Sequence, residues 1–236
     1  MITAIQLKER HRAVRDSQDV QTSTRFHRAI SWLIRAEQET SDNDARFIFQ
    51  WVALNATYAR EFGNNESERE RFRQFVNMVL ALDTEKTIHN ALYQRFSGPI
   101  RTLINNKFVF EPFWVALRTH DPSNSWEARF ADSNELAFSA LLNNKTAVLL
   151  EIVFSRLYVL RNQLVHGGAT WNSRVNRHQV KDGANILGTI LPLIISVMLD
   201  HPQHDFGEVL YPVVCGASWR QWITNPRTVP RTGGVH

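Results

Sequence analysis

Apolar residues recur at helical spacing in several long segments of the chain. Between Arg25 and Glu39, four apolar residues fall on one side of a helix and charged residues on the other: Phe26, Ile30, Leu33 and Ile34. This pattern predicts an amphipathic helix. The next segment has N-cap residue types at 41–44, is apolar almost all round up to Arg60, and has Gly63 as its expected C-cap. We expect this second helix to lie at the centre of the fold.

Two further helices are predicted in the second half of the chain. The first, from Lys145 to His166, has Asn143 and Asn144 as expected caps and ends at a Gly-Gly pair. Its apolar residues form one stripe, namely Leu149, Ile152, Val153, Leu157, Leu160 and Leu164. The second runs over 176–199 and includes the apolar run from Ile186 to Leu199. That run is shorter than the roughly 20 residues of a membrane span, so we interpret it as a buried helix.

The middle of the chain is less regular. Charged residues dominate the start of 66–82, which indicates a solvated helix face, and apolar residues dominate its end. Glycine and proline at Gly98, Pro99, Pro112 and Pro122 divide 83–144 into short helical pieces. No convincing strand pattern occurs.

These patterns predict an all-α fold with a four-helix-bundle core. The expected organisation is a single helical domain over 1–200, with core helices at about 25–63 and 145–199 and an irregular helical insertion at about 64–144. Residues 201–236 are expected to form a C-terminal extension.

Composition narrows the class of protein. A single cysteine, Cys215, cannot form an internal disulfide or a cysteine zinc cluster, which favours a reducing compartment. Residues 1–16 have no apolar stretch of the length found in secretory signals. We therefore expect a cytoplasmic protein without a membrane partner.

Most of the basic residues are arginine, and few are lysine. Of 27 basic side chains, 22 are arginine, and the formal net charge is +4. Arginine binds phosphate bidentately and stacks on bases, so this excess is compatible with RNA as a partner. Taken alone, the excess is better explained by coding bias and solvated helix faces.

The segment RNQLVH, 161–166, combines residues that suit phosphate chemistry. Asn162 and His166 are four residues apart and share a helix face. Arg161 is about 140° from His166 around the helix, but its side chain is long, and both side chains can project beyond the helix end. A buried, unpaired Arg161 would cost several kcal/mol, so it must reach water, a carboxylate or a phosphate. Imidazole can transfer protons near neutral pH, while guanidinium stabilises the charge of a reacting phosphate.

This segment resembles the Arg-polar-x3-His signature of HEPN domains, the higher eukaryote and prokaryote nucleotide-binding superfamily. FIFQWVALNATYA, 47–59, is also similar to the earlier helix of bacterial HEPN proteins found in defence and toxin loci. The resemblance covers 25–63 and 145–199.

The resemblance implies a homodimer in which two motifs face each other and form one ribonuclease site. His166 would be the general acid or base, Arg161 would bind the scissile phosphate, and Asn162 would orient one of them. Cleavage would need no metal or cofactor, would use the ribose 2′-OH as nucleophile and would serve toxin–antitoxin or antiviral defence, with a possible antitoxin or defence-system partner. Gly168 occupies the position of a tyrosine that is nucleotidylated in some HEPN proteins, which argues against such modification.

Weaker candidates surround this motif. A basic loop with one aromatic residue follows it and is a candidate for binding flanking nucleotides: Trp171, Arg174, Arg177 and Lys181. The alternative is a solvated loop with the tryptophan packed on the bundle. Asn55, in the apolar second helix, is either a substrate-binding residue or a hydrogen-bonded core amide.

Two other patterns are set aside. His201 and His204 have no evident third metal ligand, so no metal site is predicted. A second Arg-x4-His pair, Arg231 and His236, is set aside because it lies in a glycine-rich terminus.

The alternative function is an inactive HEPN-type module that binds RNA, a nucleotide or a protein. A structural helical subunit is a third possible function.

Overall fold

A computed structural model describes residues 2–59, 67–174 and 176–211 of the protein. The regular secondary structure in these ranges is helical, with no strand, which confirms the all-α prediction. The α-helices are α1 (Ala4–Val14), α2 (Val20–Glu37), α3 (Asn43–Tyr58), α4 (Glu68–Leu82), α5 (Thr87–Arg95), α6 (Ser97–Ile104), α7 (Glu111–Thr119), α8 (Ser125–Leu142), α9 (Thr146–Val165) and α10 (Arg177–Leu199). Two 3-10 helices are η1 (Arg15–Ser17) and η2 (Lys107–Val109).

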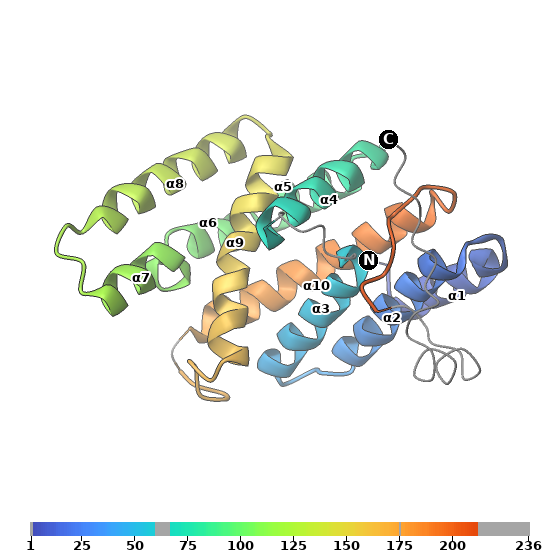
Figure 1. Cartoon of the computed structure of the whole chain (residues 1–236), viewed down its shortest axis with the longest axis horizontal. Helices are drawn as coiled ribbons and strands as arrows, with labels where there is room; N and C mark the ends of the chain where they lie inside the picture. The colour runs from blue at the N-terminus through green and yellow to red at the C-terminus, as the bar shows by residue number, and fades with distance from the viewer. Residues whose placement is uncertain (1, 60–66, 175, 212–236) are drawn as a thin grey trace, which may run out of the picture.

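Helices α3 and α10 form the centre of the fold. Helix α2 packs along one side of α3, and α10 packs along another side. Helix α9 packs against both α3 and α10 (Figure 1). Close approach of α10 depends on Gly183, where an added Cβ would lie 2.9 Å from Cδ2 of Leu157 and 3.0 Å from Cε2 of Phe47. The predicted central position of the second helix is therefore correct, and α10 shares that position.

The predicted insertion is largely part of this core. Helix α4 packs on α9 and α10, and α5 and α6 also contact α10. The solvated start of α4 and its apolar end follow the sequence pattern, with four residues buried at helical spacing: Phe72, Phe75, Val76 and Val79. Among the helices that the structure describes, only α7 and α8 project from the rest of the molecule (Figure 1). Residues within 64–144 thus help to position α9.

Several predicted boundaries were wrong for local reasons. Pro112 lies in the first turn of α7, where its missing N–H costs no hydrogen bond, so it begins a helix instead of interrupting one. Helix α8 is a regular helix of 18 residues, longer than the predicted short pieces. Asn143 and Asn144 do not cap α9, because its N-cap is Lys145 without a side-chain hydrogen bond. Helix α1, with a capping box formed by Thr3 and Gln6, was not anticipated.

The ends of the other predicted helices agree more closely. Asp42 caps α3 through the N–H of Ala45, as its residue type predicts. Helix α3 ends at Tyr58, earlier than expected, and the predicted C-cap Gly63 lies outside the described residues, as does Cys215. By length and composition α10 is apolar enough to cross a membrane, but 72% of its apolar window is buried inside the fold. This burial agrees with the prediction of a core helix.

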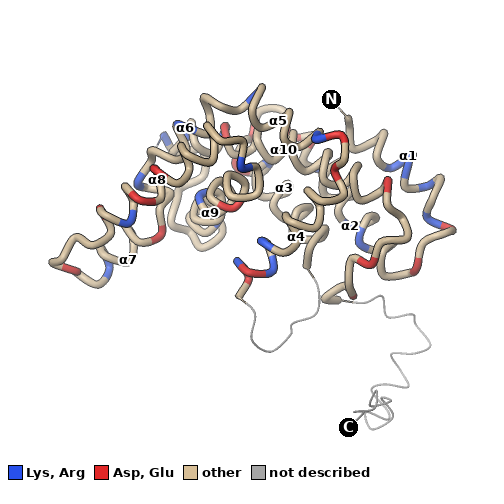
Figure 2. The backbone as a smooth tube through the Cα atoms, turned by 90° about the horizontal axis from the view of Figure 1, so that it is seen from above, with Lys and Arg blue, Asp and Glu red and all other residues tan. Residues whose placement is uncertain are grey.

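Basic and acidic residues are interspersed along the described backbone, including the projecting helices α7 and α8 (Figure 2).

Acid is expected to destabilise the protein through His11 on α1. Its side chain is buried, with Nε2 3.3 Å from Oγ of Ser23. Burial lowers the pKa of His11, and the charges of His27 and Arg15 lower it further. The unfolded chain therefore takes up a proton more readily than the folded protein once the pH falls below about 6.5. The free energy of unfolding should decrease between about pH 7 and pH 5.

Thermal unfolding at a series of pH values measures this effect. His11→Gln should flatten the decrease in Tm towards acid pH, whereas His178→Gln, at an exposed position, should leave it unchanged. An unaltered slope in the His11 variant would show that other groups govern the acid sensitivity.

Candidate functional site

The RNQLVH motif forms the C-terminal end of α9. Helix α9 ends at Val165 with His166 as its C-cap, and the His166 N–H donates to the carbonyl of Asn162. Gly167 follows with φ +70°, a conformation that favours glycine. The predicted helix end at the Gly-Gly pair is therefore confirmed, and its position leaves the last turn open to solvent.

Asn162 and Tyr158, both on α9, orient the side chain of Arg161. Its Nη1 donates to Oδ1 of Asn162 at 2.9 Å, and its guanidinium carbon lies 5.7 Å from the ring centroid of Tyr158. No carboxylate of the described residues lies within ion-pair distance of Arg161. The guanidinium is thus oriented by neutral groups, and its positive charge remains available to an anion. The expectation that Asn162 orients one member of the pair agrees with this hydrogen bond.

His166 lies apart from Arg161 within one chain. Its side chain is exposed, and no hydrogen bond between the two side chains occurs in this described part of α9. Five residues separate them, which corresponds to about 7.5 Å along the axis and about 140° around it. Asn162 lies between them on the helix surface. A single copy therefore holds the arginine and the histidine without a hydrogen bond between them.

The carboxylate of Glu68, which links two tyrosines, lies beside Arg161. Glu68 of α4 accepts hydrogen bonds from Tyr58 of α3 at 3.2 Å and from Tyr158 of α9 at 3.1 Å. Burial and the Glu68 charge raise the pKa of both tyrosines, while Arg161 acts in the opposite direction on both. A hydrogen bond with Asn162 also lowers the pKa of Tyr158. Both hydroxyls therefore stay protonated at neutral pH and donate to Glu68.

The sequence does not reveal this cluster, because its members come from three helices. Glu68 lies in the ERERFR stretch, which reads as a solvated face, and most charges there are indeed at the surface: Arg69 pairs with Glu151 and Arg73 pairs with Glu70. The only sequence signal was that Tyr158 and Asn162 are four residues apart on α9.

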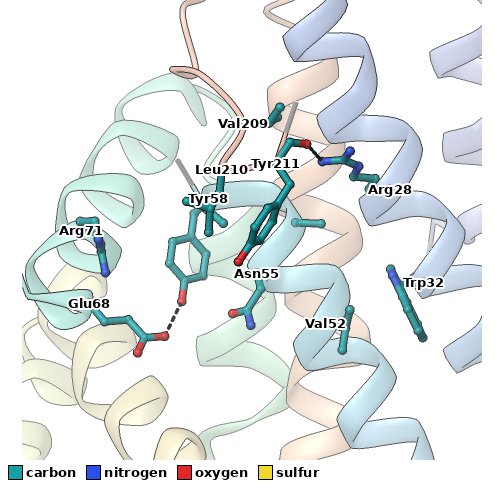
Figure 3. A pocket seen from close by; sticks show the side chains of 12 residues that line it. Arg28, Trp32, Val52, Asn55, Tyr58, Glu68, Arg71, Val209, Leu210 and Tyr211 are labelled. Carbon is teal, nitrogen blue, oxygen red and sulfur yellow. Dashed lines mark hydrogen bonds between the residues drawn. The ribbon is translucent and has the colours of Figure 1, made fainter. Parts of the chain in front are cut away.

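Asn55 lines a pocket of about 510 Å³ next to this cluster. Tyr58 and Glu68 form one wall, and Arg28 and Tyr211 lie on the opposite side (Figure 3). Oδ1 of Asn55 is buried and has no hydrogen-bond partner among the described residues. The structure thus places Asn55 near the candidate site through Glu68 and Tyr58, and not in direct contact with Arg161.

The loop after the motif is anchored to the start of α3. The indole N–H of Trp171 donates to Asp42 at 2.8 Å, and the N–H of Asn172 donates to Asp44 at 2.9 Å. Both terminal nitrogens of Arg177 bind the buried carboxylate of Asp44. Arg177, proposed from sequence as a phosphate ligand, therefore has its charge neutralised by Asp44.

The remaining predicted loop residues face solvent. Trp171 is 70% exposed, so its ring is accessible although its N–H is bound, and it is not packed on the bundle. Arg174 and Lys181 are exposed, without an ion pair among the described residues. These three side chains remain suitable for contacts with a polyanion.

Among the described residues, the other histidines do not gather with acidic residues into a group that could hold a metal ion. Nδ1 of His201 lies 2.9 Å from the carbonyl oxygen of Val197, and the ring of His204 contacts Phe206. Arg231 and His236 lie outside the described residues.

Comparison of the chain with protein-family models, with characterised proteins and with solved structures gives no match.

Proposed function

We propose that the protein is a HEPN-type, metal-independent endoribonuclease in which Arg161 and His166 carry the chemistry. The observation that supports this most directly is the state of Arg161. Its guanidinium is fixed by Asn162 and Tyr158, has no carboxylate partner in the described structure, and lies at the solvent-accessible end of α9. Such an arginine is prepared to bind a phosphate group.

In the proposed reaction, the ribose 2′-oxygen attacks the adjacent phosphorus and gives up its proton to a base. The bond from phosphorus to the 5′-oxygen then breaks, and that oxygen takes a proton from an acid. His166 supplies proton transfer, because imidazole changes charge near neutral pH. Arg161 stabilises the extra negative charge on phosphorus oxygens. The products are a 2′,3′-cyclic phosphate and a 5′-hydroxyl.

The separation of Arg161 from His166 favours a site shared by two copies of the chain. Within one copy the two side chains form no hydrogen bond with each other, and a second α9 in a dimer would bring another arginine and histidine to the site. Val165, 50% exposed beside His166, offers an apolar contact at this end. Trp171 and Arg174 would then bind nucleotides flanking the cleaved bond.

Incubation of the purified full-length protein with total RNA and tRNA tests this proposal. We expect cleavage that continues in EDTA, fragments with cyclic phosphate ends, and no cleavage of a substrate with 2′-deoxyribose at the scissile position. Cleavage that stops in EDTA, or that leaves 3′-hydroxyl ends, would contradict the 2′-OH mechanism.

The second candidate is a module that binds RNA, a nucleotide or a protein without cutting. It is favoured by the lack of a hydrogen bond between Arg161 and His166 in one copy. If this candidate is right, the wild-type protein gives no product, His166→Ala retains RNA affinity, and Arg161→Ala loses it. A defence role, with an antitoxin or other partner, rests on the resemblance alone and is part of the proposal.

A further inference from the structure

Arg156 is a buried cation without a buried anion. It lies in the middle of α9 with 2% of its surface exposed. Its Nη2 donates to Oγ of Ser133 at 3.0 Å and to Oδ1 of Asn134 at 3.4 Å, whereas Nε is buried without a hydrogen-bond partner. No carboxylate of the described residues is within ion-pair distance. Burial lowers the pKa of Arg156 to about 10, so the side chain stays protonated at neutral pH.

Two aromatic rings account for part of this burial. The guanidinium carbon lies 4.4 Å from the ring centroid of Phe110 and 5.5 Å from that of Phe130. Such contacts stabilise a cation partially but do not neutralise its charge. A buried charge that has only neutral partners is unfavourable for stability, so its presence calls for a reason other than folding.

Arg156 lines an open cavity of about 600 Å³ between α3, α4, α8, α9 and the start of α7. This volume is within the usual range of small-molecule sites. Much of the wall is apolar and aromatic, from Trp51, Phe72, Phe110 and Phe154. A ligand with a flat apolar body would fit such a wall.

The charges around the cavity limit the charge of the ligand. Its charged lining consists of three arginines and four carboxylates: Arg69, Arg129, Arg156, Glu68, Glu111, Asp132 and Glu151. Arg69 is already paired with Glu151 through Nε at 3.1 Å and Nη2 at 2.9 Å. Only Arg156 is both buried and unpaired. The carboxylates would repel a dianion about twice as strongly as a monoanion, and a single negative charge is enough to neutralise Arg156.

We propose that this cavity binds a small organic monoanion, a flat apolar molecule with one carboxylate, and that Arg156 binds the carboxylate. The aromatic wall takes up the apolar body. Tyr58, Glu68 and Tyr158 also line this cavity, so the ligand lies next to the residues that surround Arg161. The proposal does not depend on ribonuclease activity, because its test measures binding.

Calorimetric titration of the full-length wild-type protein with 1-naphthoate, 1-naphthylmethanol and 1-naphthyl phosphate tests the charge requirement. We expect naphthoate to bind at least about tenfold more tightly than the neutral alcohol, because only the carboxylate forms a charged hydrogen bond with Arg156. The dianionic phosphate is expected to bind more weakly than naphthoate. Equal affinity for naphthoate and the alcohol, or no binding of naphthoate at millimolar concentration, would overturn the proposal.

Two matched variants test the role of Arg156. Arg156→Gln should weaken naphthoate binding by about tenfold or more, whereas Arg129→Gln, an exposed arginine of the same cavity, should leave it within about twofold. An equal loss in both variants would place the anion at the rim and overturn the assignment. If Arg156→Gln does not fold, the comparison of the three probes on the wild-type protein still decides the question.

Discussion

Replacing Arg161 with alanine is expected to reduce RNA cleavage by about 100-fold or more, because loss of one charge-stabilising donor has an effect of that size in other enzymes. The fold should remain intact. Arg161 is only half-buried and donates one hydrogen bond, to Asn162 on its own helix, so the free energy of unfolding should change by about 1 kcal/mol or less. Initial cleavage rates and thermal unfolding measure the two effects separately.

Arg174→Ala is the matched control for this change. It removes the same charge from the exposed loop that follows α9, and we expect less than about a tenfold loss. Asn162→Ala should have an intermediate effect, since Asn162 orients Arg161 and is not itself charged. Equal losses in the Arg161 and Arg174 variants would indicate general electrostatic attraction of RNA in place of a specific phosphate contact.

Mixing two inactive variants tests whether the site is shared. A mixed dimer of Arg161→Ala and His166→Ala chains retains one arginine on one copy and one histidine on the other. Recovery of part of the activity would show that the two groups act across copies, as the separation of Arg161 from His166 within α9 suggests. If the mixture stays inactive although mixed dimers form, a site shared in this way is excluded.

Replacing Arg25 with methionine is expected to cause the largest loss of stability, about 3–5 kcal/mol. Arg25 on α2 is 1% exposed, and its guanidinium binds backbone carbonyls from two distant segments. Nη1 donates to Thr57 at 2.9 Å and to Ala59 at 3.0 Å, and Nη2 donates to Gly207 at 2.9 Å and to Glu208 at 3.4 Å. Methionine fills a similar volume but leaves these acceptors without their donor.

Arg28→Met provides the control for this prediction. Arg28 is one turn further along α2 and donates to the carbonyl of Tyr211 at an exposed position, so its loss should cost less than about 1 kcal/mol. Chemical denaturation of both variants gives the comparison. A loss below about 1 kcal/mol for Arg25→Met would mean that water replaces the guanidinium.

The helices were largely predictable because their signals are local. The apolar stripe of α9 and its Gly-Gly end gave both the helix and the position of the RNQLVH motif at its C-terminal end. Asp42 at the start of α3 acted as the N-cap that its residue type predicts. The predicted helix boundaries were wrong where one residue type occurs in two kinds of local structure. Pro112 lies in the first turn of α7 and does not interrupt a helix, and Asn144 does not cap α9.

The environment of the motif was not predictable in the same way. Glu68 in its charged stretch gave no sign that it would accept hydrogen bonds from two tyrosines. Arg177 was indistinguishable from Arg174 in the sequence, yet the structure pairs the first with Asp44 and leaves the second exposed. Arg156 is one of 22 arginines, and only its burial beside a cavity distinguishes it.

The amino-acid order alone determined that this chain is helical, that Arg161, Asn162 and His166 lie at a helix end, and that α10 is apolar enough for a core. Helical periodicity is set by neighbours within a few residues, which is why it can be read directly. Tertiary packing decided which charges are neutralised and which stay available. The partners of Tyr158, Trp171 and Arg177 are 90, 129 and 133 residues away along the chain, and no local pattern encodes contacts at such separations.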